Sequence, residues 1–144
     1  MSIEHNKTVE LMIVEEALNK GNLSIVDELV TPDYVYHGPN DVEANGPDGY
    51  RQFIASLRTY YPDIHVTIEN ILAEGDFVAT RTTSIFTYRG EGRDATPTFR
   101  KVTLTGSILD RFEGNKLAET WEVYDRLDLF KQLGLIPSKG PVKP

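Results

Sequence analysis

Two acidic residues near the C-terminal end of the chain, Glu122 and Asp125, are the strongest candidates for chemistry. A carboxylate held in a dry pocket can act as a general base, because burial tunes its pKa upward. Asp125 also has a structural interpretation, since it precedes an apolar helical pattern and has Asp128 three residues on, as an N-cap does. A helix N-terminus favours the anion and lowers its pKa. We therefore interpret Asp125 as a structural cap or an alternative acid. Glu122 is either a working base or a solvated or paired strand acid.

Two further residues could assist such a base. His37 could donate a hydrogen bond or exchange a proton near neutral pH, or it could be a loop histidine bonded to the backbone. Arg81 lies within a predicted strand. If it is buried, it needs a carboxylate partner such as Glu122 or Asp110 and would line a cavity; otherwise it lies on the convex face of the sheet. The three histidines of the chain are scattered without ligand spacing, so we predict no metal site.

The alternation of side chains along a strand indicates which face of the sheet Glu122 occupies. Successive strand side chains point to opposite faces, so Glu122 shares a face with Thr120 and Tyr124, and Trp121 takes the other face. The face that holds the only tryptophan is the more apolar one, which argues that Glu122 points away from the core. That argument is weaker if both faces are covered, one by helices and the other by a second copy of the chain.

The elements that must position these residues follow from hydrophobic periodicity. Apolar residues at helical spacing predict helices over residues 6–20, 23–30 and 46–62. Alternation predicts strands over residues 64–72, 77–88, 99–112 and 117–124. Hairpin turns are expected at residues 74–76 and 113–115, a polar loop over 89–97, and a last helix from Asp125 to Gly134. Helices segregated from an antiparallel four-strand meander predict an α+β fold.

Length and composition limit the classes of function. A chain of 144 residues indicates one domain, which we place at residues 1–137, followed by a short Pro- and Lys-containing tail at 138–144. The net charge of −7 disfavours nucleic acid, and the absence of cysteine excludes disulfides and thiolate sites. The sequence contains no run of about 18 apolar residues, so it predicts no membrane span. The polar N-terminus does not have the pattern of a signal peptide, so we expect a cytoplasmic protein.

Three blocks of the chain resemble the SnoaL-like polyketide (ester) cyclase family. They are NKGNLSIVDELVTPDYVYHGP at 19–39, GPDGYRQFIASLRTYYPDIHVTIENILAEGDFVATR at 46–81 and GNKLAETWEVYDRLDLFKQLGLIP at 114–137. The resemblance spans residues 6–137. It implies the nuclear transport factor two-like fold, a cone in which a curved antiparallel sheet wraps around helices and encloses a hydrophobic pocket. The same fold carries several reactions as well as non-enzymatic scaffolds, so the fold alone does not decide the function.

The resemblance implies a cofactor-independent cyclase or isomerase that acts on a small polyketide-like or other carbonyl compound. In such cyclases a carboxylate of the last strand removes a C–H proton and the enolate attacks a carbonyl. Glu122 falls where these enzymes carry their aspartate, and His37 lies in a segment where members often have a histidine near the pocket mouth. A planar ligand would suit an aromatic wall. The expected ligand contacts are Tyr34, Tyr50, Phe53, Leu57, Ile108, Trp121 and Tyr124.

The chain departs from those cyclases on the preceding strand. They use a histidine there, whereas residues 101–112 contain none and Ile108 stands near its position. The alternative function is therefore a small-ligand-binding or protein-interaction domain without turnover. Apolar residues on both parities of the strands, such as Ile108 against Leu109 and Trp121, also predict a homodimer through the outer face of the sheet.

Overall fold

Four strands in the C-terminal half form the antiparallel meander that the alternation predicts. They are β3 (His65–Glu74), β4 (Phe77–Glu91), β5 (Pro97–Glu113) and β6 (Lys116–Tyr124). The computed structural model describes residues 2–91 and 97–137. The centre of the polar loop expected at 89–97 and the tail expected at 138–144 therefore lie outside the described residues. β4 and β5 extend further toward this loop than the sequence predicts.

Two more strands complete the sheet, and the sequence pattern did not predict them. β1 (Val30–His37) lies parallel to β6, and the short β2 (Glu43–Asn45) pairs antiparallel with β1. The sheet order is β2-β1-β6-β5-β4-β3. Pro32 interrupts the alternation within β1, and the pairing partner of β1 is distant in the sequence. Local periodicity therefore carries little signal for this strand.

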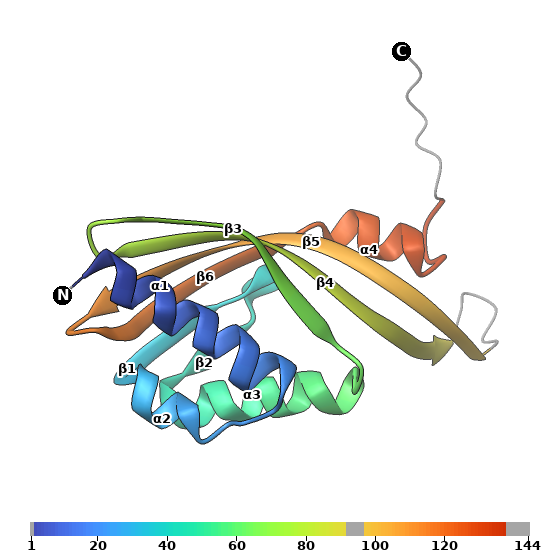
Figure 1. Cartoon of the computed structure of the whole chain (residues 1–144). Helices are drawn as coiled ribbons and strands as arrows, with labels where there is room; N and C mark the ends of the chain where they lie inside the picture. The colour runs from blue at the N-terminus through green and yellow to red at the C-terminus, as the bar shows by residue number, and fades with distance from the viewer. Residues whose placement is uncertain (1, 92–96, 138–144) are drawn as a thin grey trace, which may run out of the picture.

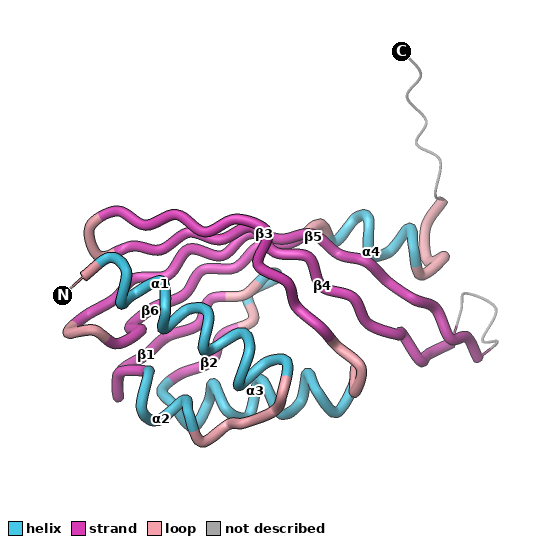
Figure 2. Tube along the Cα trace, in the orientation of Figure 1, coloured by secondary structure: helices cyan, strands magenta, loops and turns pink. Residues whose placement is uncertain are grey.

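The helices cover one face of the curved, open sheet, which makes the fold α+β (Figures 1 and 2). They are α1 (Ile3–Met12), the π-helix η1 (Ile13–Asn19), α2 (Ile25–Leu29) and α3 (Gly46–Tyr60), with a short 3₁₀ turn η2 (Pro39–Asp41) before β2. The single helix expected over residues 6–20 is thus an α-helix that widens into a π-helix. Gly21, at φ +78°, ends it with a backbone conformation that other residues rarely adopt.

The side-chain amide of Asn19 and the guanidinium of Arg58 connect η1 to its neighbours. Asn19 Nδ2 donates to Val66 O at 2.9 Å, and Val66 N donates to Asn19 Oδ1 at 2.8 Å. This pair of bonds occupies backbone groups of the edge strand β3. Arg58 of α3 donates to Leu18 O at 2.6 Å and to Asn19 O at 2.9 Å. These contacts satisfy carbonyl groups at the end of η1 and hold η1, α3 and β3 in a fixed arrangement.

The last helix, α4 (Arg126–Gln132), packs against β5 beyond the end of β6. Asp125 Oδ1 accepts a hydrogen bond from Asp128 N at 2.9 Å, which is the geometry of an N-cap. Gln132 is tied to Thr103 through both of its amide atoms: Thr103 N donates to Oε1 at 3.1 Å and Nε2 donates to Thr103 O at 2.8 Å. Asp125 thus begins the helix, and Gln132 anchors its other end to the sheet.

The core lies between the helices and the concave face of the sheet. One buried cluster joins α1, η1, α2, α3 and β1, around residues such as Ile13, Val26 and Ile54. A second cluster lies toward α4, around Val102 and Phe86. No helix among the described residues has both the length and the apolar character needed to cross a membrane.

Candidate functional site

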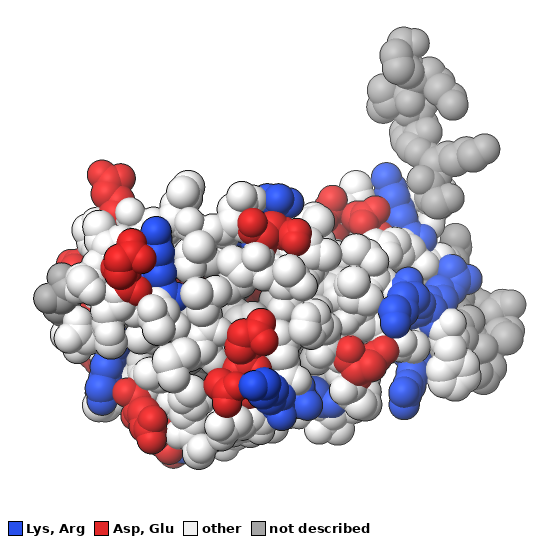
Figure 3. Space-filling view, viewed as in Figure 1, with Lys and Arg blue, Asp and Glu red and all other residues white. Residues whose placement is uncertain are grey.

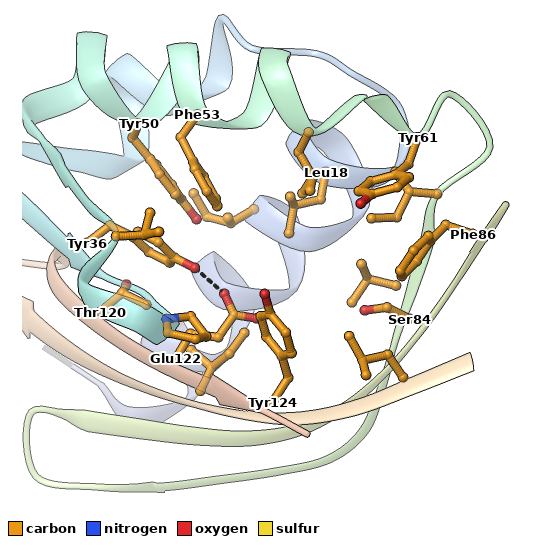
Figure 4. A pocket seen from close by; sticks show the side chains of 18 of the residues that line it. Leu18, Tyr36, Tyr50, Phe53, Tyr61, Ser84, Phe86, Thr120, Glu122 and Tyr124 are labelled. Atoms are coloured by element: carbon orange, nitrogen blue, oxygen red, sulfur yellow. Dashed lines mark hydrogen bonds between the residues drawn. The ribbon is translucent and has the colours of Figure 1, made fainter. Parts of the chain in front are cut away.

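A cavity of about 190 Å³ separates the concave face of the sheet from α1, η1 and α3. Its wall is mainly apolar, and six aromatic rings contribute to it: Tyr36, Tyr50, Phe53, Tyr61, Phe86 and Tyr124. Figure 4 shows Tyr50 and Phe53 projecting from α3 toward the strands, with Tyr124 on the opposite wall. Leu129 of α4 also lines the cavity. The cavity is therefore enclosed by elements from both halves of the chain.

Glu122 points into this cavity from β6. Its cross-strand partner on β5 is Ile108, which also lines the cavity. The Tyr36 hydroxyl donates to Glu122 Oε1 at 2.5 Å (Figure 4). Burial raises the pKa of Glu122 above its ordinary value of 4.5; the Tyr36 hydrogen bond opposes this rise, and the nearby charge of Asp110 adds to it. Glu122 is thus a carboxylate held by one neutral donor in an apolar surrounding.

A second acidic group lies at the inner wall of the same cavity. Asp110 of β5 and Glu10 of α1 are 1% and 3% exposed, and both line the cavity. The Thr120 hydroxyl donates to Asp110 Oδ1 at 2.6 Å. Burial raises the pKa values of both carboxyls, and the charge of Asp110 adds to the rise at Glu10. Two carboxyls therefore face each other away from bulk solvent.

Sequence reasoning did not place these two acids in the cavity. Asp110 entered it only as a partner for Arg81, although it is two residues from Ile108 and so shares its strand face. Glu10 lies three residues before Ile13 and seven before Ala17, so it belongs to the apolar stripe of the first helix. An acidic residue within an apolar stripe was the signal that could have found it.

The residues expected to contact a ligand fall into two groups. Tyr50, Phe53, Leu57, Ile108 and Tyr124 line the cavity. Tyr34 does not, because it is fully buried behind the wall, with its ring 4.7 Å from that of Tyr50. Trp121 does not either, because it lies on the outer face of β6 and is 37% exposed.

The expected partners of Glu122 are also on the outer face. His37 pairs with Trp121 across β1 and β6, stacks on its ring at 5.5 Å, and is hydrogen-bonded through Nε2 to Glu119 Oε2 at 2.7 Å. Arg81 is exposed and donates to Asn70 Oδ1 at 2.8 Å rather than to a carboxylate of the cavity. Neither residue lines the cavity, because each occupies the strand parity opposite to Glu122. For Arg81, the structure has the convex-face alternative that the sequence left open.

The parity argument itself was also wrong in direction. The face that carries Trp121 is the convex one, and the face of Thr120, Glu122 and Tyr124 looks toward the helices. The more polar parity therefore lies inside, where Thr120, Glu122 and Tyr124 line the cavity. Trp121 lies outside, where it stacks on His37.

The cavity is lined by acidic but not by basic side chains. No Lys, Arg or His is among its described lining residues, whereas three carboxyls are. On the face shown in Figure 3, several Lys and Arg side chains gather toward the C-terminal end of β4 and the start of β5, and side chains of both signs are interspersed over the rest of the surface. No group of three or more His, Asp or Glu side chains within residues 2–91 and 97–137 is arranged as metal ligands. The site as described can accept, store and donate protons with its own side chains.

Comparison with known proteins gives relatives of the same architecture. AclR from Streptomyces galilaeus, a hydroxylase candidate, is 29% identical, with a TM-score of 0.77 over 94% of this chain and 100% of its own. IdmH from Streptomyces antibioticus, a polyketide cyclase candidate, is 26% identical, with a TM-score of 0.78 over 90% of this chain and 98% of its own. A SnoaL-like polyketide cyclase candidate from Jannaschia sp. CCS1 is 20% identical, with a TM-score of 0.81 over 95% and 97%, and supports the fold alone.

No protein with a curated description matches this chain by sequence. The model of the SnoaL-like polyketide cyclase family matches residues 9–133, a range that includes all three carboxyls of the cavity. With its curved sheet, its helices on the concave face and this match over most of its length, the chain belongs to the SnoaL-like polyketide cyclase family.

Proposed function

We propose that the protein is a cofactor-independent cyclase or isomerase that acts on a small carbonyl compound, with Glu122 as its general base. The single observation that carries the proposal is the Glu122 carboxylate, which faces an apolar cavity and has one neutral hydrogen-bond donor at 2.5 Å. A base without a cationic partner keeps its affinity for protons. Family membership supports the reaction class.

The proposed reaction is an intramolecular aldol step. Glu122 removes a proton from carbon next to a carbonyl, and the resulting enolate forms a carbon–carbon bond to a second carbonyl carbon, whose oxygen then takes up a proton. Tyr36 fixes the direction of the carboxylate through its hydrogen bond. The six aromatic rings exclude water and present flat surfaces to a planar ligand. All these groups belong to the chain itself.

The cavity volume limits the ligand. An apolar cavity of about 150 Å³ accepts a benzene-sized molecule. The 190 Å³ of this cavity therefore suits one ring with substituents or a small bicyclic compound. Three carboxyls and no cation in its lining disfavour an anionic ligand. We propose an uncharged carbonyl compound of this size.

A second candidate function is ligand binding without turnover. It is favoured by Ile108, which stands across from Glu122, near the strand position where the family resemblance implies a histidine. An aliphatic side chain there neither gives nor takes a proton.

We further propose that the chain forms a homodimer through the convex face of the sheet. Leu72, Ala79, Leu109 and Trp121 are direct cross-strand neighbours on β3, β4, β5 and β6. All four are exposed, so they form an apolar row across the sheet. An exposed row of this kind is typical of an interaction surface.

The test uses 5-nitrobenzisoxazole, a small bicyclic probe of carboxylate bases. A base removes its ring C–H proton, the electron pair forms a nitrile, and the N–O bond breaks to release a phenolate. Glu122→Gln keeps the shape of the side chain and removes its basicity. We expect it to lower the rate by about 10²–10⁴ and to leave the affinity for 2-cyanophenol nearly unchanged.

Glu119→Gln is the matched control. Glu119 lies on the same strand but on the outer face, bonded to His37 and Arg111. We expect this variant to turn over the probe at the wild-type rate. Equal rates for Glu122→Gln and wild type would contradict the assignment of the base. A wild-type protein that binds 2-cyanophenol but does not accelerate the reaction would favour the binding function.

A further inference from the structure

The Glu10 and Asp110 carboxyls form a polar group that the base mechanism does not use. They come from α1 and β5 and meet at the cavity wall, almost completely buried. Asp110 Oδ1 accepts from Thr120 at 2.6 Å, whereas the buried Oδ2 has no hydrogen bond among the described residues. Glu10 is the acid that interacts with Asp110. The Asp110 oxygen without a hydrogen bond therefore has a neighbour, the Glu10 carboxyl, that can carry a proton.

Electrostatics decides how many protons the pair holds. Two facing carboxylates that are both ionised, buried and without a cation would repel strongly, so one proton is retained between them. The Thr120 hydroxyl stabilises the charge on Asp110, which leaves the proton on Glu10. The titratable side chains that face the pair are Glu122 of β6, Tyr34 of β1 and Tyr50 of α3. None of them is a cation that could release this proton.

We propose that Glu10 and Asp110 share one proton and act as the proton donor of the cavity, beside the base Glu122. This proposal rests on the function proposed above. Asp110 pairs directly with Thr120, and Glu122 is two residues further along β6 on the same face. Such diagonal positions are separated by about 7–8 Å. All three carboxyls line the same cavity, so one small ligand can contact both acidic groups.

The proton balance of the aldol step supplies a role for each. Glu122 gains the proton from carbon as the carbon–carbon bond forms and the carbonyl π bond breaks. The carbonyl oxygen becomes an alkoxide, and Glu10 gives it a proton, leaving Glu10 and Asp110 without their shared proton. Solvent protons then restore Glu10, and Glu122 loses its proton to solvent. The pair thus performs the acid role for which residues 101–112 offer no histidine.

The first measurement locates the proton without requiring turnover. The infrared spectrum of the wild-type protein at neutral pH should contain the C=O stretch of a protonated, buried carboxylic acid. Glu10→Gln should remove this band. Asp110→Asn serves as the second variant if Glu10→Gln does not fold. The control is Glu15→Gln, an exposed position further along the same N-terminal helical segment, which should keep the band. A wild-type spectrum without the band would overturn the proposal.

The second measurement tests the donor role with two probes. Unsubstituted benzisoxazole expels a more basic phenolate than the 5-nitro compound, so its reaction depends more on a proton donor. Glutamine keeps the shape of Glu10 but has no transferable proton. We expect Glu10→Gln to slow the unsubstituted probe by about 10² and the 5-nitro probe much less. Glu122→Gln should slow both probes to the same extent.

The pattern of outcomes separates this proposal from the function on which it rests. Equal slowing of both probes by Glu10→Gln would overturn the donor role while leaving Glu122 as the base. Wild-type protein that accelerates neither probe would overturn the proposed function and, with it, the catalytic role of the pair. A selective loss on the unsubstituted probe, together with loss of the acid band, would support the proposal.

Discussion

The two faces of β6 carry a glutamate each, and their surroundings differ. On the convex face, Glu119 is bonded to His37 at 2.7 Å and to Arg111 at 3.3 Å, so cationic or ionisable partners take up its charge. On the concave face, Glu122 has the Tyr36 hydroxyl and an aromatic cavity. The comparison teaches that the surroundings of a carboxylate, more than its presence on the last strand, determine whether it can serve as a base.

The largest expected effect concerns the convex face. If this face joins two copies of the chain, Leu109→Glu places two charges in an apolar interface and should convert the dimer into a monomer. Light scattering at micromolar concentration measures the mass. Leu127→Glu is the control, because Leu127 is also exposed but lies on α4, and it should leave the dimer intact. A monomeric wild-type protein would contradict the proposed dimer, because the convex face would then not be covered by a second copy.

The next effect concerns the cost of keeping Glu122 in the cavity. Its folded-state pKa is raised, so between the ordinary value of 4.5 and the folded-state pKa the folded protein binds more protons than the unfolded chain. The stability contributed by this group therefore falls as the pH rises through that window. Glutamine does not ionise, so it avoids the cost of burying a charged carboxylate. Glu122→Gln should be more stable than wild type at neutral pH, by about 1.4 kcal/mol per unit of the shift.

Chemical denaturation at two pH values checks this sign. The advantage of Glu122→Gln should shrink as the pH falls below the ordinary pKa, where the wild-type carboxyl is protonated in both states. Glu119→Gln provides the comparison from the convex face and should lose stability through its broken ion pairs rather than gain it. An advantage of Glu122→Gln that does not change with pH would show that burial of the charge is not its cause.

The smallest effect concerns Asp125, which directly follows the last strand. Asp125→Ala removes the acceptor for Asp128 N and should lower the free energy of unfolding by about 1 kcal/mol. Asp125→Asn should cost little, because asparagine is also a good N-cap. Denaturation curves measure both. If Asp125→Asn kept full stability but abolished turnover of the benzisoxazole probes, Asp125 rather than Glu122 would carry the chemistry.

Local signals allowed much of the fold to be predicted. The meander strands follow from alternation, and α4 follows from its cap at Asp125 and the glycine at 134. β1 was missed because Pro32 breaks its pattern and because its parallel partner lies far along the chain. The π-helical turn of η1 was missed because a wide apolar arc in sequence does not distinguish it from an ordinary helix. Non-local pairing and helix winding depend on packing that periodicity does not encode.

The candidate site was predicted only in part, for a related reason. Family resemblance identified Glu122 as the candidate base. Whether its side chain points into the cavity depends on which face of β6 it occupies. The position of Trp121 argued against a cavity position for Glu122, on the assumption that a tryptophan marks the interior. Here the tryptophan is external and stacks on His37. Glu10 was overlooked because its partner Asp110 comes from a strand a hundred residues away, and only the fold brings the two acids together.

The most direct test of the central claim is a crystal structure of the protein with 2-cyanophenol, the product of the unsubstituted probe. The account predicts that its ring lies in the cavity between α3 and the sheet. One edge of the ring should be at Glu122 and its polar substituents should be near Glu10 and Asp110. A ligand seated on the convex face beside Trp121 and His37, with the cavity collapsed or filled by side chains, would contradict the claim that the concave face holds the chemistry.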